Sequence, residues 1–359
     1  MKLGVIASIA HRLPPVNYGP WEQIASTLTE GFVARGHDVT LFASRNSKTS
    51  AALHGTAPAG YEEDQTLDAK VEGALHIAAA FEQAADFDVI ANHFDFLPLT
   101  YSRLVSTPVV TTIHGFSSER IVPVYREYND IASYVAISDS NRHPDLTYAA
   151  TIHHGIDVDA FTFVPEHGDY LLFLGRIHPD KGTHRAIEVA RKAGLPLIIA
   201  GVIQDETYFA NAVQPHIDGT TVSYVGPVEP AERNKLLGGA RALLHLISFT
   251  EPFGLSVVEA LAAGTPVIAT PLGSMQELIR DGSTGFLVRD VASAIAAVGR
   301  LDALDRRACR QDAANRFSAD RMIDDYLALF ERITEKRRPR RAYAQGIGSV
   351  GLFSDVPSW

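Results

Sequence analysis

The stretch TEPFGLSVVEALAAGTPVIAT, residues 250–270, decides the fold and poses the main question about function. It holds two glutamates eight positions apart, Glu251 and Glu259. A Pro-Phe-Gly turn separates the first from an apolar helix that is predicted to begin at Gly254 and to end at Gly264, before a proline. Glu259 lies among apolar neighbours, where a carboxylate without a partner is costly. We therefore expect Glu259 to have a partner, and both acids to flank one ligand.

Length and composition indicate an ordinary globular protein. The chain has 359 residues, too many for one typical core, so two domains are expected. A net charge of −10 argues against nucleic acid as a partner. The single cysteine, Cys309, excludes an intrachain disulfide and a cysteine-based zinc cluster. The apolar start, MKLGVIASIA, lacks a signal-cleavage pattern, and no apolar stretch approaches the roughly 20 residues of a membrane span. A cytoplasmic protein is expected.

Short apolar runs alternate with helical patterns along nearly the whole chain. Continuous apolar runs are typical of strands that are buried on both faces of a parallel sheet, and the intervening segments are long enough for crossover helices. The pattern predicts an α/β fold. The predicted strands are Leu3–Ile9, Asp38–Ala43, Asp88–Asn92, Val109–Ile113, Tyr134–Ile137, Thr151–His153, Tyr170–Leu174, Pro196–Ala200, Thr221–Val225, Ala242–Leu246 and Pro266–Ala269.

The aperiodic segment GIDVDAFTFVPEHG, residues 155–168, divides the chain into two halves. The predicted organisation is an N-terminal domain over 1–155, a C-terminal domain over 156–317, a C-terminal helix over 318–335 and a tail over 336–359. Basic residues stand at the start of the tail. They are interpreted as the solvent-exposed end of the preceding helix, with a lipid- or nucleic-acid-binding segment as the alternative. They are Lys336, Arg337, Arg338, Arg340 and Arg341.

Ligands of such proteins bind beyond the carboxyl ends of strands, next to helix N-termini. Gly19, in PPVNYGPWEQIA, precedes a predicted helix from Trp21 to Arg35, whose free N–H groups could seat a phosphate. The alternative is a plain turn glycine. The dinucleotide fingerprint G-x-G-x-x-G is absent, which argues against a dehydrogenase.

Two cations follow the first predicted strand of the second half. Arg176 and Lys181, in FLGRIHPDKG, suit a diphosphate, although surface cations are the alternative. The backbone N–H groups of Phe253, Gly254 and Leu255 open the next candidate helix and could hold the same charged group.

Other features are interpreted as structural. Asp157 and Asp159 form a D-x-D sequence, but it lies in the segment between the two halves rather than after a strand. His153 and its neighbouring histidine lack a convincing third ligand, so no metal is expected. Ser274 and Glu277 have the spacing of a capping box, and Glu277 is predicted to cap a helix.

The sequence E-P-F-G-L-x-x-x-E-A-L-A-A-G-T-P-V-I-A-T resembles the E-x₇-E region of retaining glycosyltransferase family 4. The resemblance extends over most of the chain, through the Gly19 loop and the motifs TIHG (112–115), AISDS (136–140), HHGID (153–157), GRIHPDKG (175–182) and VGPV (225–228). It implies a GT-B fold, in which two Rossmann-like domains with parallel sheets face a central cleft. It also implies that the last helix crosses back to the first domain.

The resemblance implies roles for the charged residues. Glu251 would hold hydroxyls of the donor sugar, and Glu259 would hold the ribose hydroxyls. Arg176 and Lys181 would neutralise the diphosphate of a nucleoside-diphosphate sugar.

The resemblance also implies roles for neutral positions. Backbone groups around Gly226 and Val228 would face the base, and His114 would contribute a hydrogen bond and a wall near the reacting sugar. Two departures stand out. Pro20 replaces a glycine and removes an N–H donor, and His154 stands where asparagine is usual.

The expected function is a retaining, metal-independent transfer of a hexose from a UDP- or GDP-linked donor, without a cofactor. The alternatives are a phosphorylase or epimerase on the same fold and a catalytically silent sugar-nucleotide-binding protein. Residues 1–155 carry 10 lysines and arginines against 17 acids, a net charge of −7. Because such a domain is repelled by an anionic membrane, we expect no stable membrane association and a small, water-soluble acceptor.

Overall fold

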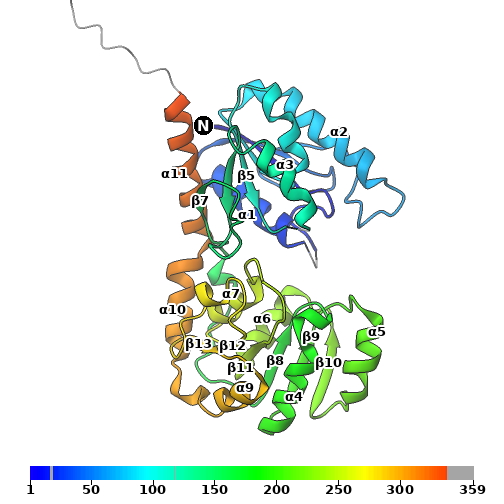
Figure 1. Cartoon of the computed structure of the whole chain (residues 1–359), viewed down its shortest axis with the longest axis vertical. Helices are drawn as coiled ribbons and strands as arrows, with labels where there is room; N and C mark the ends of the chain where they lie inside the picture. The colour runs from blue at the N-terminus through cyan, green and yellow to red at the C-terminus, as the bar shows by residue number, and fades with distance from the viewer. Residues whose placement is uncertain (17–18, 117, 338–359) are drawn as a thin grey trace, which may run out of the picture.

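The computed structural model describes residues 1–16, 19–116 and 118–337. Two α/β units lie one above the other, each built around its own parallel sheet (Figure 1). The predicted fold class, two Rossmann-like domains, is thereby confirmed. The part of the predicted tail beyond residue 337 lies outside the described residues.

The N-terminal sheet has the order β3-β2-β1-β4-β5-β6-β7, with every neighbouring pair parallel. Its strands are β1 (Lys2–Ala7), β2 (Asp38–Phe42), β3 (Ala52–His54), β4 (Val89–His93), β5 (Val109–Ile113), β6 (Ser133–Ala136) and β7 (Tyr148–Thr151). The C-terminal sheet has the order β10-β9-β8-β11-β12-β13 and is also parallel. Its strands are β8 (Leu171–Leu174), β9 (Leu197–Ala200), β10 (Val222–Gly226), β11 (Ala242–His245), β12 (Val267–Ala269) and β13 (Gly285–Leu287).

Helices cover both faces of each sheet. They are α1 (Pro20–Ala34), α2 (Ala69–Glu82), α3 (Val122–Glu127), α4 (Thr183–Ala193), α5 (Glu206–Tyr208), α6 (Pro230–Gly239), α7 (Leu255–Ala262), α8 (Met275–Leu278), α9 (Val291–Val298), α10 (Arg306–Phe317) and α11 (Ala319–Arg337). In the N-terminal unit, α1 and α11 pack on one face of the sheet and α2 on the other. In the C-terminal unit, α7 and α10 pack on one face, with α4 and α9 on the other.

Three strands differ from the expectation. The edge strands β3 and β13 were not predicted, because each has three residues and neither presents a run long enough to be distinguished from a loop. β7 ends at Thr151, where the predicted strand begins. The pair His153 and His154 therefore follows the strand and lies at the carboxyl edge of the sheet.

The chain crosses twice between the two units, and the two crossings are hydrogen-bonded to each other. The backbone N–H of Ile156 donates to the carbonyl oxygen of Phe317 at 2.9 Å, and the N–H of Ala319 donates to the carbonyl oxygen of Ile156 at 2.8 Å. A Cβ on Gly155 would lie 2.4 Å from the carbonyl oxygen of Ser318, so this close pairing requires glycine. Motion of one unit against the other would have to pivot here.

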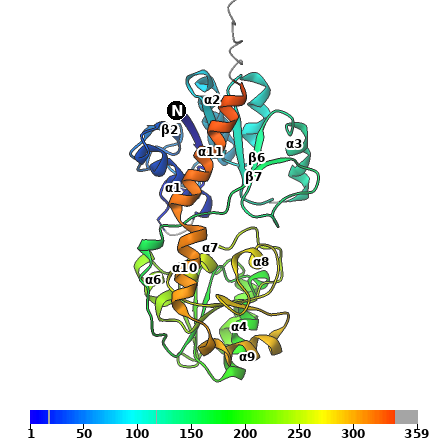
Figure 2. The same cartoon turned by 90° about the vertical axis from the view of Figure 1, so that its left-hand side faces the viewer.

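Beyond this crossing, α11 lies along the N-terminal unit beside α1 (Figure 2). Phe32 and Phe330 meet edge to face with ring centroids 5.6 Å apart. The hydroxyl groups of Thr112 and Tyr326 are 2.7 Å apart, which anchors α11 to the end of β5. Over the part of the chain that the structure describes, no helix combines the length and the apolarity needed to cross a membrane.

Candidate active site

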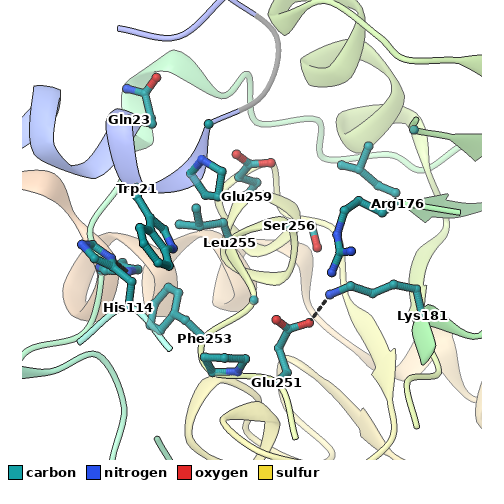
Figure 3. A pocket seen from close by; sticks show the side chains of 18 of the residues that line it. Trp21, Gln23, His114, Arg176, Lys181, Glu251, Phe253, Leu255, Ser256 and Glu259 are labelled. Carbon is teal, nitrogen blue, oxygen red and sulfur yellow. Dashed lines mark hydrogen bonds and ion pairs between the residues drawn. The ribbon is translucent and has the colours of Figure 1, made fainter. Parts of the chain in front are cut away.

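A cavity of about 560 Å³ opens between the two units, and residues of both units line it (Figure 3). All of the site residues predicted from the sequence line it except Gly226, which is the last residue of β10. Its neighbours Pro227 and Val228 do line it. The cavity therefore lies where parallel α/β sheets bind ligands, beyond the carboxyl ends of the strands.

The loop that carries Lys181 is fixed by a glycine. A short 3-10 turn, Pro179–Lys181, ends at Gly182, which has φ 74°. A Cβ there would lie 2.1 Å from the carbonyl oxygen of Leu246, so any other residue would push this loop away from the end of β11. The glycine thus brings a loop that follows β8 against a loop that follows β11.

Lys181 and Glu251 meet across this contact as a buried ion pair. The Nζ of Lys181 lies 2.5 Å from Oε2 of Glu251, and the side chains are 13% and 11% exposed. His245 Nε2 lies 3.4 Å from the same carboxylate oxygen. Burial alone would raise the pKa of Glu251, but His245 and the charge of Lys181 lower it to about 2. Glu251 is therefore a carboxylate at neutral pH, and it can accept hydrogen bonds from hydroxyl groups.

Glu259 has the partner that its apolar surroundings required. Its carboxylate, on α7, lies 3.3 Å from the guanidinium of Arg233 on α6. Burial raises the pKa of Glu259, and the charge of Arg233 partly opposes that effect. Arg233 also lines the cavity, so the two form a charged pair at its wall.

The start of α7 supplies N–H groups between the two glutamates. Gly254 precedes the helix with φ 96°, and a Cβ there would lie 2.8 Å from Cε of Met275. The first N–H groups of a helix have no intrahelical acceptor, and they carry partial positive charge. Leu255 and Ser256, the first two residues of α7, both line the cavity. This helix start is suited to an anionic group.

Arg176 and Lys181 lie on the same side of the cavity, across from α1 (Figure 3). Arg176 follows β8 and hydrogen-bonds through its guanidinium to the side chain of Gln204. The Nζ of Lys181 lies 4.5 Å from the ring centroid of Phe249. Two cations and a helix start thus converge on one region, which suits a diphosphate.

A row of three histidines, His93, His114 and His154, lies at the opposite wall, where His114 and His154 line the cavity. Nε2 of His114 lies 3.1 Å from Nδ1 of His93, and its Nδ1 lies 3.3 Å from Nε2 of His154. Burial, with the neighbouring His154 and His93, holds the pKa of His114 well below its usual value. The imidazole is neutral at pH 7. Both ring nitrogens already face histidine partners, so a hydrogen bond to a sugar would have to replace one of these contacts.

Trp21 stacks on this row. Its ring centroid lies 5.2 Å from that of His114 with the planes 20° apart, and the indole lines the cavity. The neighbouring Gly19 has φ 148° and precedes α1, which begins at Pro20. Proline at the first helical position has no N–H, so this helix start offers one donor fewer than the start of α7.

The helix-cap prediction for Glu277 is wrong. Its carboxylate accepts hydrogen bonds from the backbone N–H groups of Asp139, at 2.9 Å, and Ser140, at 2.8 Å. It also lies 3.0 Å from Nε2 of His153. All three partners belong to the N-terminal unit, so Glu277 joins the two units instead of capping α8. Capping-box spacing cannot distinguish these cases, because acceptors from distant segments compete for the same carboxylate.

Replacing Glu277 with glutamine is expected to lower the free energy of unfolding by about 1.5–3 kcal/mol at pH 7, because charged hydrogen bonds between the units are lost. Burial would raise the pKa of Glu277, but His153 and the two N–H groups lower it from its usual 4.5 to about 2. The contribution is therefore full above about pH 4.5 and is lost as the pH falls towards 2. Denaturant unfolding of both proteins across this range measures the difference. A matched control is Glu188→Gln, which alters an exposed pair with Lys192.

Asp157 and Asp159, which the sequence indicates to be structural, both have partners within the fold. Asp157 accepts a hydrogen bond from the N–H of Asp159, and Asp159 pairs with Arg310 at 3.0 Å. Within the described ranges, no group of three or more histidine, cysteine, aspartate or glutamate side chains is arranged to hold a metal ion.

Several residues of the site were missed by sequence reasoning. His245 ends β11, so the rule that sites follow strands could have found it. Trp21 follows the Gly19-Pro20 pair directly, and that position was a usable signal. His93 ends β4 in the same way, directly after the strand predicted over Asp88–Asn92, whereas Arg233 lies within α6, where the sequence offers no distinguishing mark.

Two Rossmann-like units, with a helix start and two buried acids lining the cleft between them, have the architecture of a GT-B glycosyltransferase. Residues 158–318 match the family model of glycosyl transferases group 1, and residues 22–160 match that of glycosyltransferase family 4. The chain belongs to this family of glycosyltransferases.

Relatives with known names agree with this assignment. The chain is 27% identical to glycogen synthase of Mycobacterium tuberculosis, over 89% of this chain and 91% of that protein. It is 30% identical to D-inositol 3-phosphate glycosyltransferase of Mycolicibacterium smegmatis, over 56% of this chain and 51% of that protein. The structure resembles the crystal structure of Anabaena HepE in complex with UDP-glucose, with a TM-score of 0.68, 18% identity, and coverage of 91% of this chain and 99% of that one.

Proposed function

We propose that the protein is a retaining, metal-independent hexosyltransferase that uses a UDP- or GDP-linked hexose and acts in the cytoplasm. The observation that carries the proposal is the convergence of Arg176, the Lys181–Glu251 pair and the start of α7 in one cleft. The diphosphate would lie at these cations and N–H groups. Glu259 would accept hydrogen bonds from the ribose hydroxyls, and Glu251 would accept them from hydroxyls of the transferred sugar.

In the proposed reaction, the bond between the anomeric carbon and the diphosphate oxygen breaks, and an acceptor hydroxyl bonds to that carbon on the same face. Because the new bond forms on the face that the diphosphate leaves, the configuration is retained. The hydroxyl proton passes to the departing phosphate oxygen. The rate depends on stabilising the negative charge that develops on the leaving diphosphate. Arg176, Lys181 and the α7 N–H groups are fixed before the reaction and supply this stabilisation.

The acceptor is proposed to be a small molecule with a hydroxyl group, received by the N-terminal unit. The net charge of −7 over residues 1–155 would repel an anionic bilayer, and it supports the proposal that the enzyme does not bind membranes stably.

The test begins with thermal stability in the presence of UDP, GDP and ADP, each with and without EDTA. One of the first two is expected to raise Tm in a concentration-dependent manner, and EDTA is expected to leave the shift unchanged. Product analysis with the matching donor sugar and an acceptor panel should then yield an α-linked product from an α-linked donor. Loss of transfer in EDTA with recovery in Mn²⁺ would refute metal independence. Binding without transfer would indicate a silent binding protein, and a requirement for inorganic phosphate would indicate a phosphorylase.

A further inference from the structure

Charged side chains are distributed unequally between the two walls of the cavity. The C-terminal unit contributes Arg176, Lys181, Arg233, Glu251 and Glu259. Among the described residues, the N-terminal unit contributes no lysine, arginine, aspartate or glutamate to the lining. Its wall is made largely of apolar and neutral side chains, including Pro15, Val16, Trp21, Gln23, Phe116 and Ile137.

The histidines in this wall do not change its charge. His114 is 6% exposed and His154 4% exposed. Burial lowers the pKa of His154 to about 3 and that of His114 well below its usual value, so both are neutral at pH 7. The described part of the N-terminal wall therefore lacks the cationic side chains that normally bind a phosphate or a carboxylate.

Among the described residues of this wall, those at the start of α1 could also bind an anion through their backbone N–H groups, but the sequence there weakens such a site. Pro20 occupies the first helical position and has no N–H to donate. The next position is Trp21, whose indole lines the cavity. A helix start that offers a proline and a bulky aromatic ring is a poor seat for a phosphate, in contrast to the Gly254–Leu255 start of α7.

Trp21 is held in place by its surroundings. One face of the indole stacks on His114, with centroids 5.2 Å apart and planes 20° apart. His114 is itself held between His93 and His154. In Figure 3 the indole lies beside His114, and Trp21 lines the cavity together with Leu255 of the facing unit. A ring that is fixed in this way offers a flat apolar surface at little cost in conformational entropy.

From these observations we propose that Trp21 is the platform on which the acceptor stacks, and that the acceptor is an uncharged saccharide. The apolar C–H face of a pyranose ring fits a flat indole, while its hydroxyl groups remain free to react or to donate hydrogen bonds. An acceptor that carries a phosphate or a carboxylate would bury its charge against a wall without a cation, which is unfavourable. This inference rests on the proposed function, because it assigns the second substrate of the same cleft.

The composition of the chain allows a direct test. Trp21 and Trp359 are its two tryptophans, so the full-length Trp359→Phe protein reports on Trp21 alone. Glucose and maltose are each titrated into this protein in the presence of the nucleoside diphosphate that raises Tm. The same titrations are made with glucose 6-phosphate and maltose 1-phosphate for comparison. We expect a saturable change in tryptophan emission with at least one uncharged sugar, and a weaker or absent change with its phosphate monoester.

Transfer kinetics provide the second measurement. kcat/KM for the uncharged sugar should exceed that for its phosphate monoester by about 10-fold or more. Trp21→Ala should raise the acceptor KM about 10-fold and affect the donor KM less, and Trp21→Phe should recover most of the loss. Val16 lies at the same wall and is 49% exposed, so a cation can be introduced there to test the opposite change. Val16→Lys should improve use of the phosphate monoester several-fold, with Val16→Gln as the matched control.

Donor hydrolysis separates this inference from the proposed function. If the donor is bound and hydrolysed but sugar is transferred to phosphorylated acceptors alone, or to none of the uncharged saccharides, the inference is overturned and the transferase proposal stands. An equal rise of donor and acceptor KM in Trp21→Ala would also overturn it. If neither UDP nor GDP stabilises the protein, the proposed function itself fails.

Discussion

Lys181→Ala is expected to lower kcat by about 10²–10³-fold, because the Lys181 ammonium is placed to stabilise the charge that develops on the leaving diphosphate. Its Nζ lies 2.5 Å from Glu251 and 4.5 Å from the ring centroid of Phe249, so the charge is held in position before the donor binds. A preorganised cation of this kind needs little rearrangement during the reaction. Steady-state transfer rates with saturating donor and acceptor measure the effect.

The same substitution leaves Glu251 with a weaker set of partners, so folding must be measured in parallel. His245 remains 3.4 Å from the carboxylate, and we therefore expect the loss of turnover to exceed the loss of stability. Lys181→Arg retains the charge and should keep more activity than Lys181→Ala. Lys192→Ala removes an exposed lysine that is paired with Glu188 and should leave the rate unchanged. A folded Lys181→Ala protein whose kcat is within about 3-fold of the native value would contradict the assigned role.

The strands that can be predicted from the sequence are those whose own residues are buried, because burial leaves a continuous apolar or β-branched run in the sequence. β5 was predicted at its observed bounds, Val109–Ile113, because all five of its residues are buried and apolar or β-branched. The edge strands β3 and β13 could not be recognised, because an edge strand of three residues is stabilised by pairing with its neighbour. That pairing is a property of the assembled sheet and leaves little trace in the segment itself.

The site residues also fall into two groups, those that the sequence predicts and those that depend on the assembled fold. Arg176, Lys181 and Glu251 lie in the loops that follow β8 and β11, so their convergence could be expected from the geometry of parallel sheets. The row formed by His93, His114 and His154 draws on three separate segments, and its contacts appear once β4, β5 and β7 are assembled into one sheet. The contacts of Glu277 across the two units likewise depend on how the units pack. Glu277 was therefore misassigned, and His93 and Arg233 were missed although each contacts a predicted residue, His114 and Glu259 respectively.

Glu259→Ala is expected to weaken binding of the nucleoside diphosphate itself by about 1.5–3 kcal/mol, or about 10- to 150-fold in Kd. Glu251→Ala should instead impair recognition of the transferred sugar. The reason is position. Glu259 lies within α7, beyond the helix start that would seat the diphosphate, whereas Glu251 lies in the preceding loop beside Lys181.

A modified nucleotide makes this difference measurable. The native protein should bind UDP, or GDP if that is the ligand, more tightly than its 2′-deoxy analogue, because Glu259 would accept hydrogen bonds from the ribose hydroxyls. This preference should disappear in Glu259→Ala and persist in Glu251→Ala, and the four Kd values for each variant pair form a double-mutant cycle. Because burial raises the pKa of Glu259, the native preference should also weaken as the pH falls and the carboxylate takes up a proton. An equal loss of diphosphate affinity in both variants, or a preference for the ribose form that survives in Glu259→Ala, would show that Glu259 does not bind the ribose.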